Sequence, residues 1–108
     1  MSEAIDPKEL AARLRGDAPP RLLDVREPDE QWLAALPGAT LIPLGQLPVR
    51  HAEIAAWKAE ETVVFCHHGV RSRHAIAFLR SLGFTRLINL TGGIDQWSVR
   101  VDPGVRRY

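Results

Sequence analysis

The chain has 108 residues, of which 45% are hydrophobic, and its 14 basic and 13 acidic residues leave a formal charge of +1. This length and apolar content predict a single domain over residues 1–108 with one hydrophobic core. Basic and acidic residues are interspersed, apart from the pair Arg106 and Arg107. We therefore expect neither a nucleic acid nor a membrane surface as a partner. A lone cysteine and the lack of a signal-peptide pattern indicate a cytoplasmic protein.

The first half of the chain predicts two helices and two strands. Asp6 is expected to cap a helix that begins at Pro7 and ends near Arg15. The apolar run 21–25 halts at charged residues, as buried parallel strands do. A short helix over 28–35 and a second buried strand over 40–42 follow, separated by a Pro-Gly turn.

The next segments predict a helix and a central strand. A helix opened by Pro48 should continue to about Trp57. Residues 62–65 are the most β-branched run of the chain and are best placed at the centre of the sheet. The inward face of the helix is expected to carry Val49, Ala52, Ala55 and Ala56.

The end of the chain continues the alternation. From Ser72 the apolar residues repeat at a helical period, and Gly83 ends that helix. A strand over 86–90 and a helix start at 94–97 follow. The apolar stripe of the first helix is Ala75, Phe78, Leu79 and Leu82. This alternation predicts an α/β fold, a parallel sheet of about five strands with helices on both faces, whose ligands bind at the carboxyl ends of the strands.

The only cysteine, Cys66, lies between the strand over 62–65 and the helix that begins near Ser72. A thiolate at this place would be stabilised by loop N–H groups and by the helix dipole. Without that context a lone cysteine is more often an inert core residue. The flanking pattern favours thiolate chemistry on an anionic substrate.

Four stretches in order resemble the single-domain rhodaneses, a sulfurtransferase family. They are Leu23-Asp24-Val25-Arg26-Glu27, Pro37-Gly38-Ala39, the loop from Cys66 to Ser72, and the run from Leu90 to Trp97. The resemblance covers about residues 4–100 and implies the three-layer fold of that family. The histidine that often precedes the Pro-Gly-Ala turn is replaced by Ala35-Leu36. The stretch 97–108, which includes the C-terminal tail 101–108, resembles the end of a bacterial subgroup that also carries Cys-His-His-Gly, and its residues indicate no chemical role.

The resemblance implies that Cys66 takes the sulfane sulfur of a donor such as thiosulfate and passes it from a persulfide to a thiophilic acceptor, cyanide or a thiol. The backbone of the loop, in which Gly69 permits a positive φ, could cradle the terminal sulfur. Neither a cofactor nor a metal is expected. The substrate-binding residues are then His67, His68, Gly69, Val70, Arg71 and Ser72.

Arg71 has two interpretations. Its guanidinium could bind the oxyanion end of the donor, or it could pair with Asp24 and brace the loop. Asp24 and Arg26, at the end of the first strand, are expected to support the site rather than to act as an acid and a base.

The loop length separates two cysteine chemistries. Four residues stand between Cys66 and Arg71, whereas the cysteine phosphatases and the rhodanese-fold arsenate reductases have five. The shorter loop resembles the sulfur-transferring members and disfavours phosphatase or arsenate reductase activity.

The other candidate sites are weaker. His67 and His68 invite a metal site, with His51 and His74 as further candidates, but the required ligand spacing is absent. Gly92-Gly93 is expected to be a tight turn, and the three tryptophans are expected to pack in the core or at its rim.

A second hypothesis is a sulfur-relay or regulatory module that docks to a partner protein. The presence of the cysteine favours catalysis, because rhodanese-like interaction modules often lack it. The expected partners are a small-molecule sulfur donor and acceptor, with a sulfur-relay protein as a further possibility. The sequence carries no mark that separates a monomer from a homodimer.

Overall fold

A parallel five-stranded sheet forms the centre of the computed structural model, which describes residues 4–108. The strand order is β1-β5-β4-β2-β3, and every neighbouring pair is parallel. Strand β4 is therefore central, as its β-branched sequence predicted. The strands are β1 (Ala4–Ile5), β2 (Arg21–Asp24), β3 (Thr40–Leu41), β4 (Thr62–Phe65) and β5 (Leu87–Leu90).

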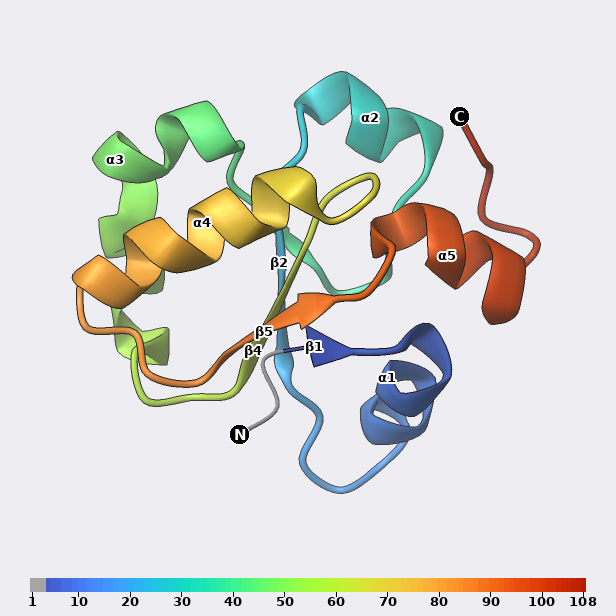
Figure 1. Ribbon diagram of the computed structural model, residues 1–108, viewed down its shortest axis with the longest axis horizontal. Coiled ribbons are helices and arrows are strands. Elements are labelled where there is room, and N and C mark those ends of the chain that lie inside the picture. Colours follow the sequence, from blue (N-terminus) through green and yellow to red (C-terminus); the bar gives the residue numbers. More distant parts are fainter. Residues whose placement is uncertain (1–3) are drawn as a thin grey trace.

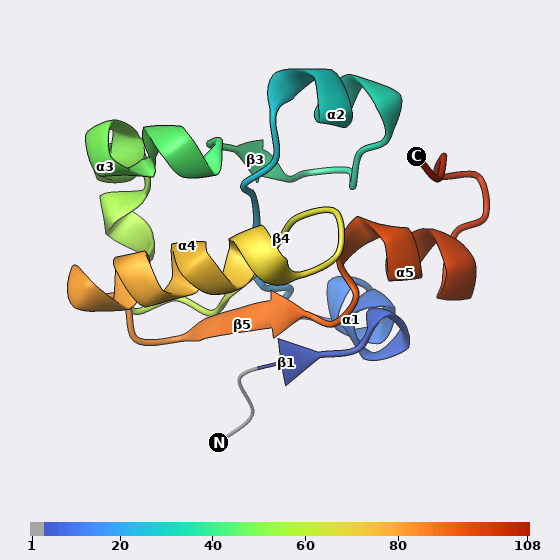
Figure 2. The same ribbon diagram turned by 45° about the horizontal axis from the view of Figure 1, so that its top comes forward.

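Helices cover both faces of the sheet, so the predicted α/β architecture is confirmed (Figure 1). One face packs against α1 and α5, and the other against α3, α4 and two 3-10 turns (Figure 2). The helices are α1 (Pro7–Leu14), α2 (Pro28–Leu33), α3 (Leu47–Arg50), α4 (Val70–Ser81) and α5 (Gly93–Arg100), and the 3-10 turns are η1 (Leu44–Gln46) and η2 (His51–Trp57). No helix among residues 4–108 is long and apolar enough to cross a membrane.

The helix boundaries follow from local chemistry. The Asp6 carboxylate accepts the Glu9 N–H at 2.8 Å, which confirms the predicted N-cap of α1. Helix α4 begins after Gly69, whose φ of +110° is disfavoured for residues with a side chain. Ala75 and Leu79 of its predicted stripe are buried, with Phe78 and Leu82 packed at the edge of the same cluster.

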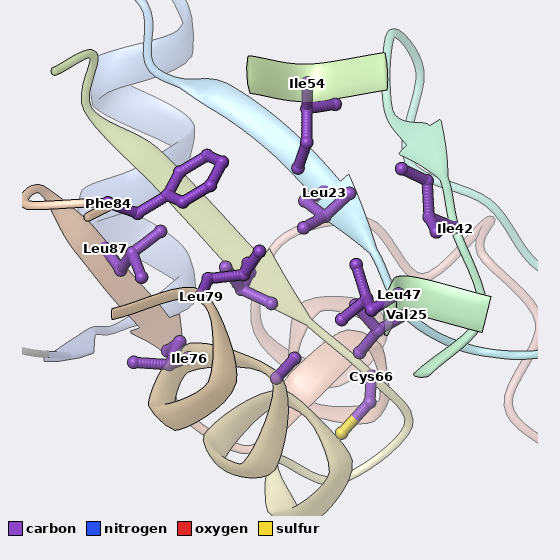
Figure 3. Packing of buried hydrophobic residues seen from close by; sticks show 12 residues of the cluster. Leu23, Val25, Ile42, Leu47, Ile54, Cys66, Ile76, Leu79, Phe84 and Leu87 are labelled. Atoms are coloured by element: carbon purple, nitrogen blue, oxygen red, sulfur yellow. The ribbon is translucent and has the colours of Figure 1, made fainter. Parts of the chain in front are cut away.

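The buried side chains form two clusters, one on each face of the sheet. Figure 3 shows the cluster under α4, in which Leu23 of β2, Ile54 of η2 and Leu79 of α4 converge. Cys66 lies at the end of this cluster with its sulfur directed toward the start of α4 (Figure 3). The reactive sulfur is thus placed where the core ends and the loop begins.

The predicted helix over 48–57 is wrong in shape and in face. The backbone changes from α3 to the 3-10 turn η2 at His51, and Ile54 has non-helical φ and ψ angles. Leu47 and Ile54 are buried, whereas Val49 is 83% exposed and the three predicted alanines, Ala52, Ala55 and Ala56, are exposed. The prediction failed because it assumed one α-helical period through a segment whose pitch changes.

One strand was missed, and one further expectation fails. Strand β1, which pairs with β5, was not predicted, since two residues are too few to show an alternation. Trp32 does not pack in the core or at its rim, because 86% of it is exposed on α2. Trp97 is buried and Trp57 is half-buried, in agreement with the expectation.

Candidate active site

Cys66 directly follows β4 at the carboxyl edge of the sheet, and Asp24 ends the neighbouring strand β2. The thiol is 1% exposed. Its sulfur accepts the N–H of Gly69 at 3.0 Å and that of Ser72 at 3.4 Å. These two amides stabilise negative charge on the sulfur. Gly69 belongs to the predicted cradle over 67–71, and Ser72 adds a donor from the first turn of α4.

The Ser72 side chain is buried beside the sulfur. Its Oγ lies 3.5 Å from Cys66 Sγ. Its hydroxyl donates to Asn89 Oδ1 at 2.5 Å, and the Asn89 amide donates to the Gly69 carbonyl at 3.3 Å. The Ser72 oxygen also lies 3.1 Å from the Gly69 carbonyl oxygen, and in its contact with the sulfur either atom could be the donor. Ser72 and Asn89 therefore join the loop to β5.

The first turn of helix α5 is hydrogen-bonded to the start of the cysteine loop. The Ile94 N–H donates to the Cys66 carbonyl at 2.9 Å, and the Asp95 N–H donates to the His67 carbonyl at 3.1 Å. These carbonyls satisfy N–H groups that have no partner within the first turn of a helix. The Gly92-Gly93 turn that precedes them was predicted, and both glycines have a positive φ.

Arg71 is turned toward α2. Its two terminal nitrogens donate to the two carboxylate oxygens of Glu30 at 2.6 and 2.7 Å. Of the two interpretations of Arg71, the pairing with Asp24 is contradicted, because Arg71 pairs with Glu30 and the Asp24 carboxylate is occupied by Arg26. The hydrogen bonds from Arg71 lower the pKa of Glu30 to about 2, so the pair is ionised at neutral pH.

Asp24 and Arg26 form a pair with almost no exposure to solvent, 1% and 0% of their side chains. Arg26 donates to both Asp24 oxygens and to the carbonyls of Glu30 and Ala34. A buried guanidinium needs such a set of acceptors. The pair fixes the segment between β2 and α2 beneath the site.

His67 lies flat between two rings. Its imidazole stacks on Tyr108 with ring centroids 3.9 Å apart and on His68 at the same spacing. Burial, with the adjacent His68 second, lowers the pKa of His67. Residues 4–108 contain no group of three histidine, cysteine, aspartate or glutamate side chains that could hold a metal ion.

His68 and Val70 are exposed. His68 lines a shallow hollow on the β5 side of the loop. The other lining residues of this hollow are Ala4, Gly69, Arg73, Asn89, Thr91 and Gly92.

The model of the rhodanese-like domain matches residues 6–100 of this chain. The chain belongs to the rhodanese-like sulfurtransferase family. It is 36% identical over 98 residues to a sulfurtransferase of Allochromatium vinosum, covering 91% of this chain and 90% of that one. The resemblance predicted from the four sequence stretches is therefore confirmed.

Solved structures confirm the rhodanese fold. A human single-domain sulfurtransferase matches with a TM-score of 0.73 and 32% identity, covering 93% of this chain and 98% of the other. A protein of Staphylococcus saprophyticus matches with a TM-score of 0.82 and 27% identity, covering 96% and 98%. Several other curated relatives are longer, and the chain spans between 25% and 30% of their length.

The rhodanese-like site contains three residues that the sequence reasoning missed, Glu30, Asn89 and Tyr108. Glu30 lies in the charged first turn of α2. Nothing in that turn indicates its partner Arg71, which is 41 positions away in the sequence. Tyr108 lies in the segment 101–108, which crosses from α5 toward α2 (Figures 1 and 2). Its hydroxyl accepts from Arg26 at 2.9 Å and donates to Glu30 at 3.0 Å.

Proposed function

We propose that this rhodanese-type protein transfers a sulfane sulfur through a persulfide on Cys66. The observation that carries the proposal is the sulfur of Cys66, which stands at the carboxyl edge of the sheet and accepts one backbone N–H from a short loop and one from the first turn of α4. Such a loop stabilises an anionic sulfur without a basic side chain in contact with it.

The first half-reaction is a displacement at sulfur. The Cys66 thiolate attacks the outer sulfur of thiosulfate, the S–S bond of the donor breaks, and sulfite leaves with the electron pair of that bond. The product is a Cys66 persulfide anion. In the second half-reaction a thiol or cyanide attacks the terminal sulfur, and the Cys66 thiolate is regenerated. No external oxidant or reductant takes part.

The structure of the loop favours sulfur transfer over oxyanion chemistry. The four residues between Cys66 and Arg71 make a small loop. The Arg71 guanidinium donates to Glu30, so it is not free to bind a tetrahedral anion. Hydrolysis of an aryl phosphate by this protein should therefore be negligible beside thiosulfate:cyanide transfer. The reverse ranking would contradict the proposal.

Intact-mass measurement tests the proposal directly. Mixing the protein with thiosulfate should add one sulfur atom to the chain, and subsequent cyanide should remove it with formation of thiocyanate. Cys66→Ser is the control and should gain no sulfur. A chain that gains no sulfur from thiosulfate or from any persulfide donor would support the alternative function, a sulfur-relay or regulatory module that binds a partner protein.

A further inference from the structure

Three cationic side chains around the cysteine loop are each paired with a carboxylate. Arg71 pairs with Glu30, Arg26 with Asp24, and Arg107 with Asp95. The Arg71 side chain is 35% exposed and that of Glu30 is 15% exposed, so solvent reaches this pair beside the cysteine loop. Paired charges attract a third ion weakly, because the carboxylate offsets the field of the guanidinium.

Glu30 is itself held in place by two further hydrogen bonds. The Tyr108 hydroxyl donates to Glu30 Oε1 at 3.0 Å, and the backbone N–H of Glu27 donates to Oε2 at 2.9 Å. Tyr108 is fixed in turn by Arg26, which donates to its hydroxyl, and by its stack on His67. Both carboxylate oxygens therefore have two donors each, and Arg71 is drawn to a preorganised acceptor.

His67 adds little positive charge on the α2 side of the loop. The pKa of His67 is lowered, chiefly by burial, which disfavours the charged imidazole. Arg73 is exposed and lines the hollow beside His68, on the β5 side of the loop. On the α2 side of the loop, the charge of Arg71 is already offset by Glu30.

We propose that Glu30, held by Tyr108, is a specificity-determining residue that withholds Arg71 from anionic donors and makes the site favour an alkyl hydropersulfide over thiosulfate. This inference rests on the proposed sulfur transfer. Thiosulfate brings two negative charges to the site, whereas a hydropersulfide brings one at most on its reacting sulfurs. Binding of the dianion therefore depends more on the Arg71 guanidinium, which is already paired with Glu30.

The transfer from a hydropersulfide balances without a co-reactant. The Cys66 thiolate attacks the outer sulfur of R–S–SH, and the S–S bond of the donor breaks. The alkyl thiolate R–S⁻ leaves with the electron pair of that bond. The proton stays on the transferred sulfur, so the immediate product is Cys66–S–SH.

The test compares the two donors on wild type and on Glu30→Gln. The rate of Cys66 persulfide formation is measured by rapid-quench intact mass over a range of thiosulfate or 2-hydroxyethyl hydropersulfide concentrations. Glutamine removes the charge that offsets Arg71, and the freed guanidinium is worth one charge-assisted hydrogen bond to the dianion. We expect the second-order rate with thiosulfate to rise about tenfold and the rate with hydropersulfide to change less than about twofold.

The double variant Glu30→Gln/Arg71→Gln identifies the source of the gain. The increase with thiosulfate should vanish, because no guanidinium is left to bind the dianion. Equal changes for both donors in Glu30→Gln, or a gain that persists without Arg71, would overturn the inference. Persulfide formation from neither donor in the wild type would instead overturn the proposed function, so the two failures are distinct.

Two more variants keep the comparison sound. Glu53→Gln breaks a solvent-accessible pair between α3 and η2, where Arg50 donates to both Glu53 oxygens, and should leave both rates unchanged. Tyr108→Phe keeps the ring and removes the hydroxyl bond to Glu30. It should move the ratio of the two donor rates in the same direction as Glu30→Gln but by less, and an unchanged ratio would exclude Tyr108 as a positioning residue.

Discussion

The α-carbon of Gly93 packs directly against the backbone carbonyl of Cys66. A Cβ built on Gly93 would lie 2.5 Å from the Cys66 carbonyl oxygen and 2.4 Å from that of His67, closer than real Cβ atoms come to such atoms. The same carbonyls accept the first N–H groups of α5. Glycine at this position is therefore what lets α5 hold the nucleophile loop.

Gly93→Ala should cost more stability and activity than its positive φ angle alone would explain. Gly83 also has a positive φ, but nothing lies within 4 Å of a Cβ built there. Gly83→Ala should cost about 1–2 kcal/mol of unfolding free energy from the left-handed backbone alone. Gly93→Ala carries this cost plus a clash with backbone atoms, so it should lose clearly more stability and most of its persulfide formation. Denaturant melts and intact-mass assays measure both, and equal losses in the two variants would contradict the contact.

Asp24→Asn should be strongly destabilising. It leaves the buried Arg26 guanidinium without a compensating charge, at a cost of about 3 kcal/mol of unfolding free energy. Glu60→Gln is the control, since Arg21 and Glu60 are 51% and 46% exposed and such pairs contribute less than about 1 kcal/mol. Urea denaturation compares the two variants, and a cost for Asp24→Asn as small as that of the control would contradict the prediction.

Acid should weaken the fold in part through Glu30. Its pKa in the folded protein is about 2, below the ordinary value of 4.5. The stabilisation is therefore complete above pH 4.5 and is lost as the pH falls toward 2. Because Arg71 is partly exposed, we expect a contribution of about 1–2 kcal/mol to the unfolding free energy. The difference in stability between wild type and Glu30→Gln should shrink over this range in denaturant melts, and a constant difference would exclude the pair as its source.

The pKa of His67 reports the Tyr108 stack. Burial, the main cause, holds this pKa below the ordinary value of 6.5. Tyr108→Ala exposes one face of the imidazole and should raise the pKa of His67 toward that value. Tyr108→Phe retains the ring and should leave it low. Nuclear magnetic resonance titration of the imidazole protons measures the shift, and identical titrations in the two variants would show that the ring does not bury His67.

Among the predictions from sequence, those that depended on neighbouring residues were confirmed. The β-branched run 62–65 is the central strand, Asp6 caps α1, and Gly69 takes the positive φ that it was expected to permit, although α4 begins at Val70 rather than near Ser72. The capping bond, the left-handed turn and the strand preference are decided within a few residues. The face of the 48–57 segment was wrong because its pitch depends on packing rather than on local preference.

The lone cysteine at the end of a β-branched strand, followed by a glycine and a helical period, determined the position of the candidate nucleophile from the sequence alone. Only the tertiary structure decided the partner of Arg71, because Glu30 and Tyr108 reach the loop from α2 and from the segment 101–108. Pairing between residues 41 and 78 positions apart depends on how the elements pack, and no local pattern encodes it. The pairing of charged side chains around Cys66 is therefore decided by how the elements pack.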